Sequence, residues 1–248
     1  MTDALLLIHA FPLDARMWDE QLRALDGGVA VVAVDLPGFG GTPLEGDVTT
    51  MAVAARHCLE ELDRAGLQRA VVCGLSMGGY VALDLWRSAR ERIVGLVLAN
   101  TRAEADTEEG KQRRRTIAET VRREGMVAIL DSQRALVSPS VSDDVWERVA
   151  SLVASQPPES VAAMSLGLAE RPDSRPDLPT IDVPTLVVTS TDDQLIDPAL
   201  SRSMADGIPG AELAVIEGAG HLSNMERPDE FNGLLLSHLE RCGLRASP

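Results

Sequence analysis

Hydrophobic residues along the chain gather in six short runs rich in β-branched side chains, and longer segments of helical pattern separate most of them. The runs are apolar nearly throughout, which is typical of strands buried on both faces of a parallel sheet. The predicted strands are Ala4–Ile8, Val29–Val34, Arg69–Cys73, Ile93–Ala99, Pro184–Thr189 and Glu212–Ile216. With helices such as Met51–Ala65 and Met77–Arg90 between them, they predict an α/β fold with right-handed crossovers and with helices on both faces of a mostly parallel sheet.

The interval between the fourth and fifth predicted strands is too long for a simple connection, because structureless loops of that length are rare in compact domains. It carries helical patterns at Thr107–Arg123, Asp143–Ser155 and Ser160–Glu170, followed by a proline-rich stretch. We therefore predict a helical cap over residues 101–183, inserted into an α/β core formed by residues 1–100 and 184–248.

A run of three arginines at 113–115 has two interpretations. It could clamp a phosphate or carboxylate, or it could form the solvated face of a helix. Glu109 and Glu119 stand four residues before Arg113 and Arg123, a spacing that stabilises helices. Because charge runs are usually solvated, the second interpretation is favoured.

Composition and charge narrow the function classes. Hydrophobic residues make up 45% and charged residues 25%, which is ordinary for a globular protein. The net charge of −15 would repel phosphate backbones and anionic membrane surfaces, so neither nucleic acid nor membrane is an expected partner.

Cysteine usage and the start of the chain point to the cytoplasm. Three scattered cysteines are too few for a disulfide framework or a zinc site, and they fit a reducing compartment. The apolar run Leu5–Ile8 lacks a preceding basic region, so it predicts a strand rather than a signal peptide. No stretch approaches the ~18 apolar residues of a membrane span.

The segment Val71–Tyr80 predicts a strand, then the pattern Gly74-x-Ser76-x-Gly78, then a helix. A sharp strand-to-helix turn strains its central residue, and glycines on both sides relieve the crowding. The turn would expose the Ser76 hydroxyl at a helix N-terminus, where negative charge is favoured. An ordinary turn is the alternative, but this context favours a nucleophilic serine.

A serine nucleophile needs a general base, and the chain has four histidines. His57 and His238 fall inside predicted helices, and His9 is expected to brace the loop after the first strand. His221 follows the last strand behind Gly218 and Gly220, at the sheet end where open α/β sheets bind ligands. We predict His221 as the base; a solvent-facing loop histidine is the alternative.

The acid that orients the base should follow the fifth strand, because the order Ser, Asp, His is typical of this architecture. Asp192, Asp193 and Asp197 are all candidates, and any of them could instead cap the next turn. The oxyanion donors are expected to be the backbone N–H groups of Met77, directly after the nucleophile, and of Phe11, in the loop after the first strand.

The predicted substrate contacts are Trp146 and Phe39, with Trp18 and Phe11 as further candidates. Core packing is the alternative for each of these aromatic residues. A pocket between the cap and the sheet edge would be mostly apolar and would admit a small to medium substrate.

Together these landmarks resemble the α/β-hydrolase superfamily over nearly the whole chain. The matching segments are His9-Ala10-Phe11-Pro12, Asp35–Gly40, Gly74–Gly79, Ser190–Asp193 with Pro198, and Gly218–His221 running on to Pro228. Within the superfamily the chain is similar to small cap-bearing esterases and lactonases, including oxoadipate enol-lactonases.

The resemblance implies an α/β-hydrolase fold with Ser76 as nucleophile, Asp193 as acid and His221 as base. Asp193 is favoured over Asp192 because the family acid stands three residues past a frequent glycine, replaced here by Ser190. The chain starts at what would be the family's third strand, so a sheet of about six strands is expected. A serine nucleophile also separates the chain from relatives that use an aspartate, the dehalogenases and epoxide hydrolases.

The expected function is hydrolysis of a small carboxylic ester or lactone through an acyl-enzyme, without a metal or organic cofactor. The alternatives are C–C bond, thioester or acyl-transfer chemistry on the same residues, and a non-catalytic small-molecule-binding protein of this fold. The expected partner is a small-molecule substrate, and the chain is expected to be a monomer or homodimer.

Overall fold

The computed structural model describes residues 3–25 and 28–244, and within them it forms one six-stranded sheet in the order β2-β1-β3-β4-β5-β6. All five strand pairings are parallel. The strands are β1 (Asp3–Ile8), β2 (Val31–Val34), β3 (Arg69–Leu75), β4 (Ile93–Ala99), β5 (Thr185–Ser190) and β6 (Glu212–Ile216). The predicted parallel sheet of about six strands is confirmed; positions 1–2, 26–27 and 245–248 of the predicted core lie outside the described residues.

Burial along the strands follows their place in the sheet. The four central strands are buried over nearly their whole length, whereas the edge strands β2 and β6 are mostly half-buried. β3 is longer than predicted, because Gly74 and Leu75 continue the pairing with Leu98 and Ala99 before the chain turns. The turn therefore begins at Ser76 and not at the first glycine.

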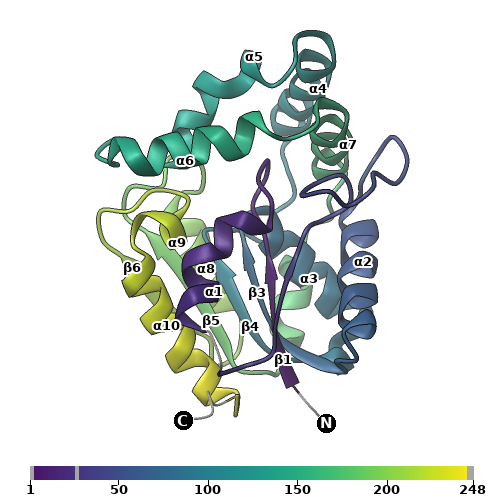
Figure 1. Ribbon diagram of the computed structural model, residues 1–248. Helices are drawn as coiled ribbons and strands as arrows, with labels where there is room; N and C mark the ends of the chain where they lie inside the picture. The colour runs from purple at the N-terminus through teal and green to yellow at the C-terminus, as the bar shows by residue number, and fades with distance from the viewer. Residues whose placement is uncertain (1–2, 26–27, 245–248) are drawn as a thin grey trace.

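Helices cover both faces of the sheet, as predicted (Figure 1). The α-helices are α1 (Asp19–Ala24), α2 (Met51–Arg64), α3 (Met77–Ala89), α4 (Glu108–Glu124), α5 (Val127–Leu130), α6 (Asp143–Ala154), α7 (Pro158–Ala169), α8 (Pro198–Gly207), α9 (Ser223–Glu226) and α10 (Pro228–Arg241). Short 3₁₀ segments are η1 (Ala15–Trp18), η2 (Arg90–Arg92), η3 (Asp131–Leu136) and η4 (Arg175–Thr180). In the described part of the chain, no helix combines the length and the apolar character that a membrane span requires.

Helices α4 to α7 lie between β4 and β5 in the chain, and they gather at the end of the sheet opposite the start of β1 and the end of α10 (Figure 1). Helix α7 is buried on nearly every side, between α4 and the loop before α2. A Cβ atom at Gly167 would lie 1.7 Å from the Thr49 carbonyl oxygen, so α7 can approach this loop closely only with a glycine there. The boundaries of this region as a separate cap, residues 101–183, stay a prediction.

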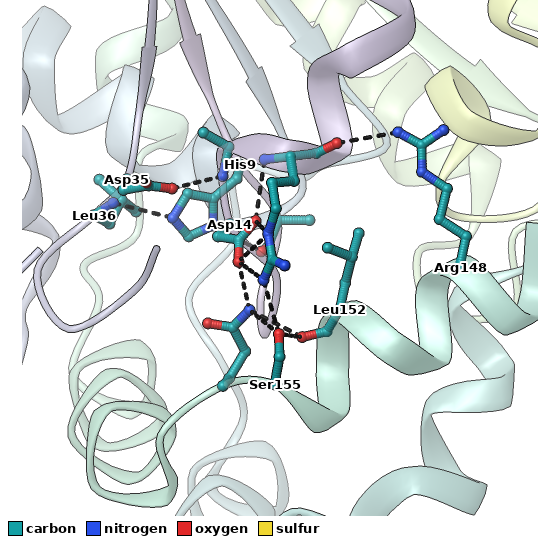
Figure 2. Close-up of polar contacts among 11 residues, drawn as sticks. His9, Asp14, Asp35, Leu36, Arg148, Leu152 and Ser155 are labelled. Atoms are coloured by element: carbon teal, nitrogen blue, oxygen red, sulfur yellow. Dashed lines mark hydrogen bonds and ion pairs between the residues drawn. The ribbon is translucent and has the colours of Figure 1, made fainter. Parts of the chain in front are cut away.

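The loop after β1 is held in place by a buried carboxylate (Figure 2). Asp14 caps η1, forms an ion pair with Arg16 at 2.6 Å, and accepts a hydrogen bond from the Gln156 amide at 2.7 Å. Gln156 lies just beyond α6, and the Ser155 hydroxyl also accepts a bond from Arg16. The loop after the first strand is thereby tied to the helices above it.

Replacing Asp14 by alanine should lower the free energy of unfolding by about 2–4 kcal/mol, because the Gln156 amide and the η1 N–H lose their acceptor. Urea denaturation measures this loss. The matched control is Asp47→Ala in an exposed loop, which should change stability by less than about 0.5 kcal/mol. Equal losses in the two variants would contradict this role for Asp14.

The contribution of Asp14 should also depend on pH. Burial alone would raise the pKa of this carboxyl, but the hydrogen bonds from Arg16 and Gln156 outweigh it and hold the pKa below its ordinary value. The stabilisation is therefore complete above about pH 5 and is lost progressively as the pH falls below that value. The difference in unfolding free energy between wild type and Asp14→Asn should narrow between about pH 5 and about pH 3.

Candidate active site

Ser76 occupies a strained turn between β3 and α3. Its φ of +56° and ψ of −112° lie outside the regions that side-chain-bearing residues favour. A Cβ at Gly74 would come within 2.1 Å of the Gly78 carbonyl oxygen, and one at Gly78 within 2.1 Å of the Ile8 carbonyl oxygen. The crowding predicted at both glycines is therefore present, and it leaves Ser76 partly exposed at the first turn of α3.

His221 and Asp193 form a buried pair. The imidazole Nδ1 lies 3.0 Å from Asp193 Oδ1 and 2.9 Å from Oδ2. Asp193 Oδ1 also accepts hydrogen bonds from the backbone N–H groups of Leu195 and Ile196. Burial by itself would raise the pKa of Asp193, but the interaction with His221 and these hydrogen bonds hold it below the ordinary value, so the side chain is a carboxylate.

The other two candidate aspartates lie elsewhere. Asp192 accepts a hydrogen bond from the Thr191 hydroxyl, and Asp197 caps α8 through the Ala199 N–H. Of the three candidates, only Asp193 contacts His221.

Asn100 is a site residue to which the sequence assigned no role, although Asn100-Thr101 after the fourth strand is part of the resemblance to the esterase and lactonase subgroup. It follows β4 with a φ of +45°, and its side-chain amide donates to Asp193 Oδ2 at 3.0 Å and to the Ser190 hydroxyl at 2.7 Å. The side-chain oxygen Oδ1 of Asn100 accepts a hydrogen bond from the Ser223 hydroxyl at 2.6 Å. The signal in the sequence was a polar residue directly after a buried strand, next to Thr101, whose hydroxyl bonds the Ser76 carbonyl at 2.8 Å.

Ser76 and His221 line the same cavity, which has a volume of about 320 Å³ and is called the Ser76 cavity below. Its lining residues are Phe11, Ser76, Met77, Tyr80, Arg102, Asp106, Thr107, Gly110, Arg113, Arg114, Ile117, Ser132, Gln133, Leu136, Leu168, Leu195, Ile196 and His221. Among the described residues, no hydrogen bond joins the Ser76 hydroxyl to the His221 ring or to any other group. The hydroxyl therefore faces the cavity unengaged.

Both predicted oxyanion donors border this cavity. In the part of the chain that the structure describes, the backbone N–H groups of Phe11 and Met77 donate no hydrogen bond. The Leu13 N–H bonds the Ala10 carbonyl at 2.9 Å and so closes the turn that carries Phe11. Among the described residues, neither N–H group is therefore used by a hydrogen bond within the protein.

Trp146 and Phe39, the expected substrate contacts, do not line the cavity. Phe39 is fully buried and packs against the His9 ring with centroids 5.2 Å apart. Trp146 lies on α6, and the Arg134 guanidinium carbon lies over the Trp146 ring, 4.7 Å from the ring centroid. Trp18 is buried against Phe231, so of the four aromatic candidates only Phe11 reaches the cavity.

The remaining histidines have structural partners. Nδ1 of His9 lies 3.0 Å from the Ala10 carbonyl, and Nε2 accepts from the Leu36 N–H at 3.1 Å, so His9 braces the loop as expected (Figure 2). His57 and His238 are buried in α2 and α10. Within residues 3–25 and 28–244 no three His, Cys, Asp or Glu side chains cluster in a way that could hold a metal.

The arginine run on α4 is only partly a solvated face. Arg113 and Arg114 line the Ser76 cavity, although Arg113 is also exposed to solvent; Arg115 is exposed beside Gln112 and does not line the cavity. The expected ion pair between Glu119 and Arg123 does not form in the described chain, because Arg123 binds the adjacent Glu124. Helical spacing alone could not show that α4 turns this part of the run toward the site.

The chain matches a model of the alpha/beta hydrolase family over residues 5–234. Among solved structures it is similar to a malate-bound thermophilic esterase from Thermogutta terrifontis, with 38% sequence identity and a TM-score of 0.94. The match covers 98% of this chain and 90% of that one.

The chain is also similar to curated proteins, among them a lactonase and an acetyltransferase component. The chain is 28% identical to 3-oxoadipate enol-lactonase 1 of Acinetobacter baylyi over 92% of its length and 85% of the lactonase. It is 32% identical to the dihydrolipoyllysine-residue acetyltransferase component of an acetoin cleaving system from Cupriavidus necator, over 96% of this chain and 63% of that longer protein. The family match includes both the six-stranded sheet and the turn at Ser76. The protein therefore belongs to the α/β hydrolase family.

Proposed function

We propose that this protein is a serine hydrolase that cleaves a small to medium carboxylic ester or lactone through an acyl-enzyme intermediate. The observation that carries the proposal is the Ser76 cavity, which is lined both by a strained serine and by a histidine whose Nδ1 bonds a buried carboxylate. Relatives named as an esterase and an enol-lactonase support an ester or lactone as the substrate.

In the acylation step, the Ser76 oxygen attacks the carbonyl carbon while His221 Nε2 takes the hydroxyl proton. Asp193 keeps the Nδ1–H of His221 pointed at its own carboxylate, so Nε2 is the free base, and it stabilises the imidazolium that forms. The N–H groups of Phe11 and Met77 stabilise the tetrahedral oxyanion. Collapse expels the alcohol oxygen, which receives the proton from His221.

In the deacylation step, the same groups act on water. His221 removes a proton from a water molecule, whose oxygen attacks the acyl-enzyme carbonyl, and the second tetrahedral intermediate releases the acid and restores Ser76. With a lactone, the alcohol and the acid are two ends of one product. A cavity of about 320 Å³ fits a substrate of small to medium size.

Acyl transfer is the second candidate, because the chain is 32% identical to an acetyltransferase component. An acceptor other than water would attack the same acyl-enzyme. Turnover in ¹⁸O-labelled water separates the two: hydrolysis places the label in the acid product, and transfer to another acceptor does not.

Replacing Ser76 by alanine should lower kcat by at least about 10³-fold on a short-chain aryl ester, because the acyl-enzyme can no longer form. A fluorophosphonate should label wild-type protein once, at Ser76, as located by mass spectrometry. Ser203→Ala, on the exposed side of α8, is the control and should keep full activity. Unchanged turnover in the Ser76 variant would refute the proposal.

The Asp193 and Asp192 variants should behave differently. Asp193→Asn should lower kcat by about 10³- to 10⁴-fold, since an amide can hold His221 in the wrong tautomer and cannot stabilise the imidazolium. Asp192→Asn alters the neighbouring carboxylate, which contacts Thr191, and should stay within about threefold of wild type. Steady-state kinetics on one ester measures both, and a larger loss at Asp192 would exchange the two assignments.

A further inference from the structure

The charged groups around the Ser76 cavity are mostly positive. Its lining includes three arginines, Arg102, Arg113 and Arg114, and a single carboxylate, Asp106. The chain as a whole carries 38 acidic and only 23 basic residues. The lining of the cavity, with three arginines and one carboxylate, therefore has the opposite sign of charge to the chain as a whole.

Asp106 cannot neutralise this cluster. Its carboxylate is almost fully buried and pairs with Arg102 at 2.5 Å, Arg171 at 2.8 Å and Arg114 at 3.3 Å. Burial would raise the pKa of Asp106, but these guanidinium groups outweigh it and hold the pKa below the ordinary value. The single negative charge of Asp106 is therefore shared among three guanidinium groups. One of them, Arg171, does not line the cavity and lies over the Tyr80 ring, 4.1 Å from its centroid.

Arg113 is the arginine of this cluster that is free to bind a ligand. In the described chain it forms no ion pair, whereas Arg122 and Arg123 of the same helix pair with Glu159 and Glu124. The Nε of Arg102 is buried and has no hydrogen-bond partner in the described residues. Among the described residues, the Arg113 guanidinium thus has no charged partner where it lines the cavity. In a partly enclosed cavity, Coulomb attraction is stronger than in open solvent.

We propose that the substrate carries a carboxylate in addition to the ester or lactone carbonyl that is cleaved, and that Arg113, with Arg102 and Arg114, binds it. The inference rests on the proposed hydrolase function and specifies its substrate class. A guanidinium presents parallel donors that match the two oxygens of a carboxylate. Arg114 lies over the Phe11 ring, 5.9 Å from its centroid, so the anion site adjoins the loop that carries one oxyanion donor.

Matched ester pairs test the proposal. Monomethyl glutarate and dimethyl glutarate share an acyl chain and differ by one negative charge; 4-acetoxybenzoate and its methyl ester place the charge on the alcohol side instead. The wild-type protein should have the higher kcat/KM for the anionic member of at least one pair. Raising the salt concentration from about 0.05 M to about 0.5 M should reduce that preference.

Arg113→Gln should lower kcat/KM for the preferred anionic ester by about tenfold and leave the neutral ester within about twofold. Arg115→Gln is the control, because it removes the same charge from the same helix at a residue that does not line the cavity. Melting temperatures of both variants should equal that of wild type. Equal losses on the anionic and neutral esters, or equal effects of the two variants, would overturn the proposal.

Direct binding separates this proposal from the hydrolase assignment. Calorimetry should detect glutarate binding that weakens about tenfold in Arg113→Gln and is unchanged in Ser76→Ala. Neutral esters that are hydrolysed without any anionic preference or glutarate binding would overturn the carboxylate site alone. Glutarate binding without labelling or turnover would overturn the hydrolase and keep the site, and tighter binding of inorganic phosphate than of glutarate would overturn the carboxylate assignment.

Discussion

The close approach of α3 to the ends of β1 and β3 determines the geometry around Ser76. Hydrogen atoms at Gly74 and Gly78 allow the first turn of the helix to lie against backbone carbonyls that a Cβ would meet at 2.1 Å. This contact forces Ser76 into a positive φ and brings the Met77 N–H beside the loop that carries Phe11. The strained backbone persists because the sheet holds both sides of the turn: the Ser76 N–H bonds the Ala99 carbonyl, and the Ser76 carbonyl accepts from Thr101.

A second constraint is electrostatic. Asp193 and His221 are both buried, and a buried carboxylate is costly unless its oxygens are fully hydrogen-bonded. Asn100 contributes one donor to Asp193 and is itself held by the hydroxyl groups of Ser190, at the end of β5, and of Ser223, at the start of α9. Because the parallel strands all end at the same edge, one amide side chain can join the loops after β4, β5 and β6. The position of the Asp193 carboxylate therefore depends on its hydrogen bonds to Asn100 and His221 as well as on β5, which precedes it in the chain.

Much of this arrangement could be predicted from the sequence because it follows from local chemistry. Continuous apolar runs predicted all six strands, and the glycines around Ser76 predicted the turn. Side-chain direction could not be predicted in the same way. Phe39 packs on His9 instead of lining the cavity, and the role of Asn100 depends on partners 90 or more residues away in the chain. The short helices α1, α5 and α9 were missed because four to six residues carry too little periodicity.

The placement of the cavity arginines shows how distant contacts decide a local property. Helix α7 is seated on the core because Gly167 lets it touch the Thr49 carbonyl, and the Thr49 N–H bonds the Ala163 carbonyl in return. The Ser165 hydroxyl of α7 then donates to the Arg114 carbonyl and sets the position of α4 along it. Helical periodicity predicts that α4 is polar but does not predict which element it packs against. The contact with α7 places the Arg113 and Arg114 part of α4 beside the Ser76 cavity. The charge of the cavity therefore depends on a glycine and a serine that never enter it.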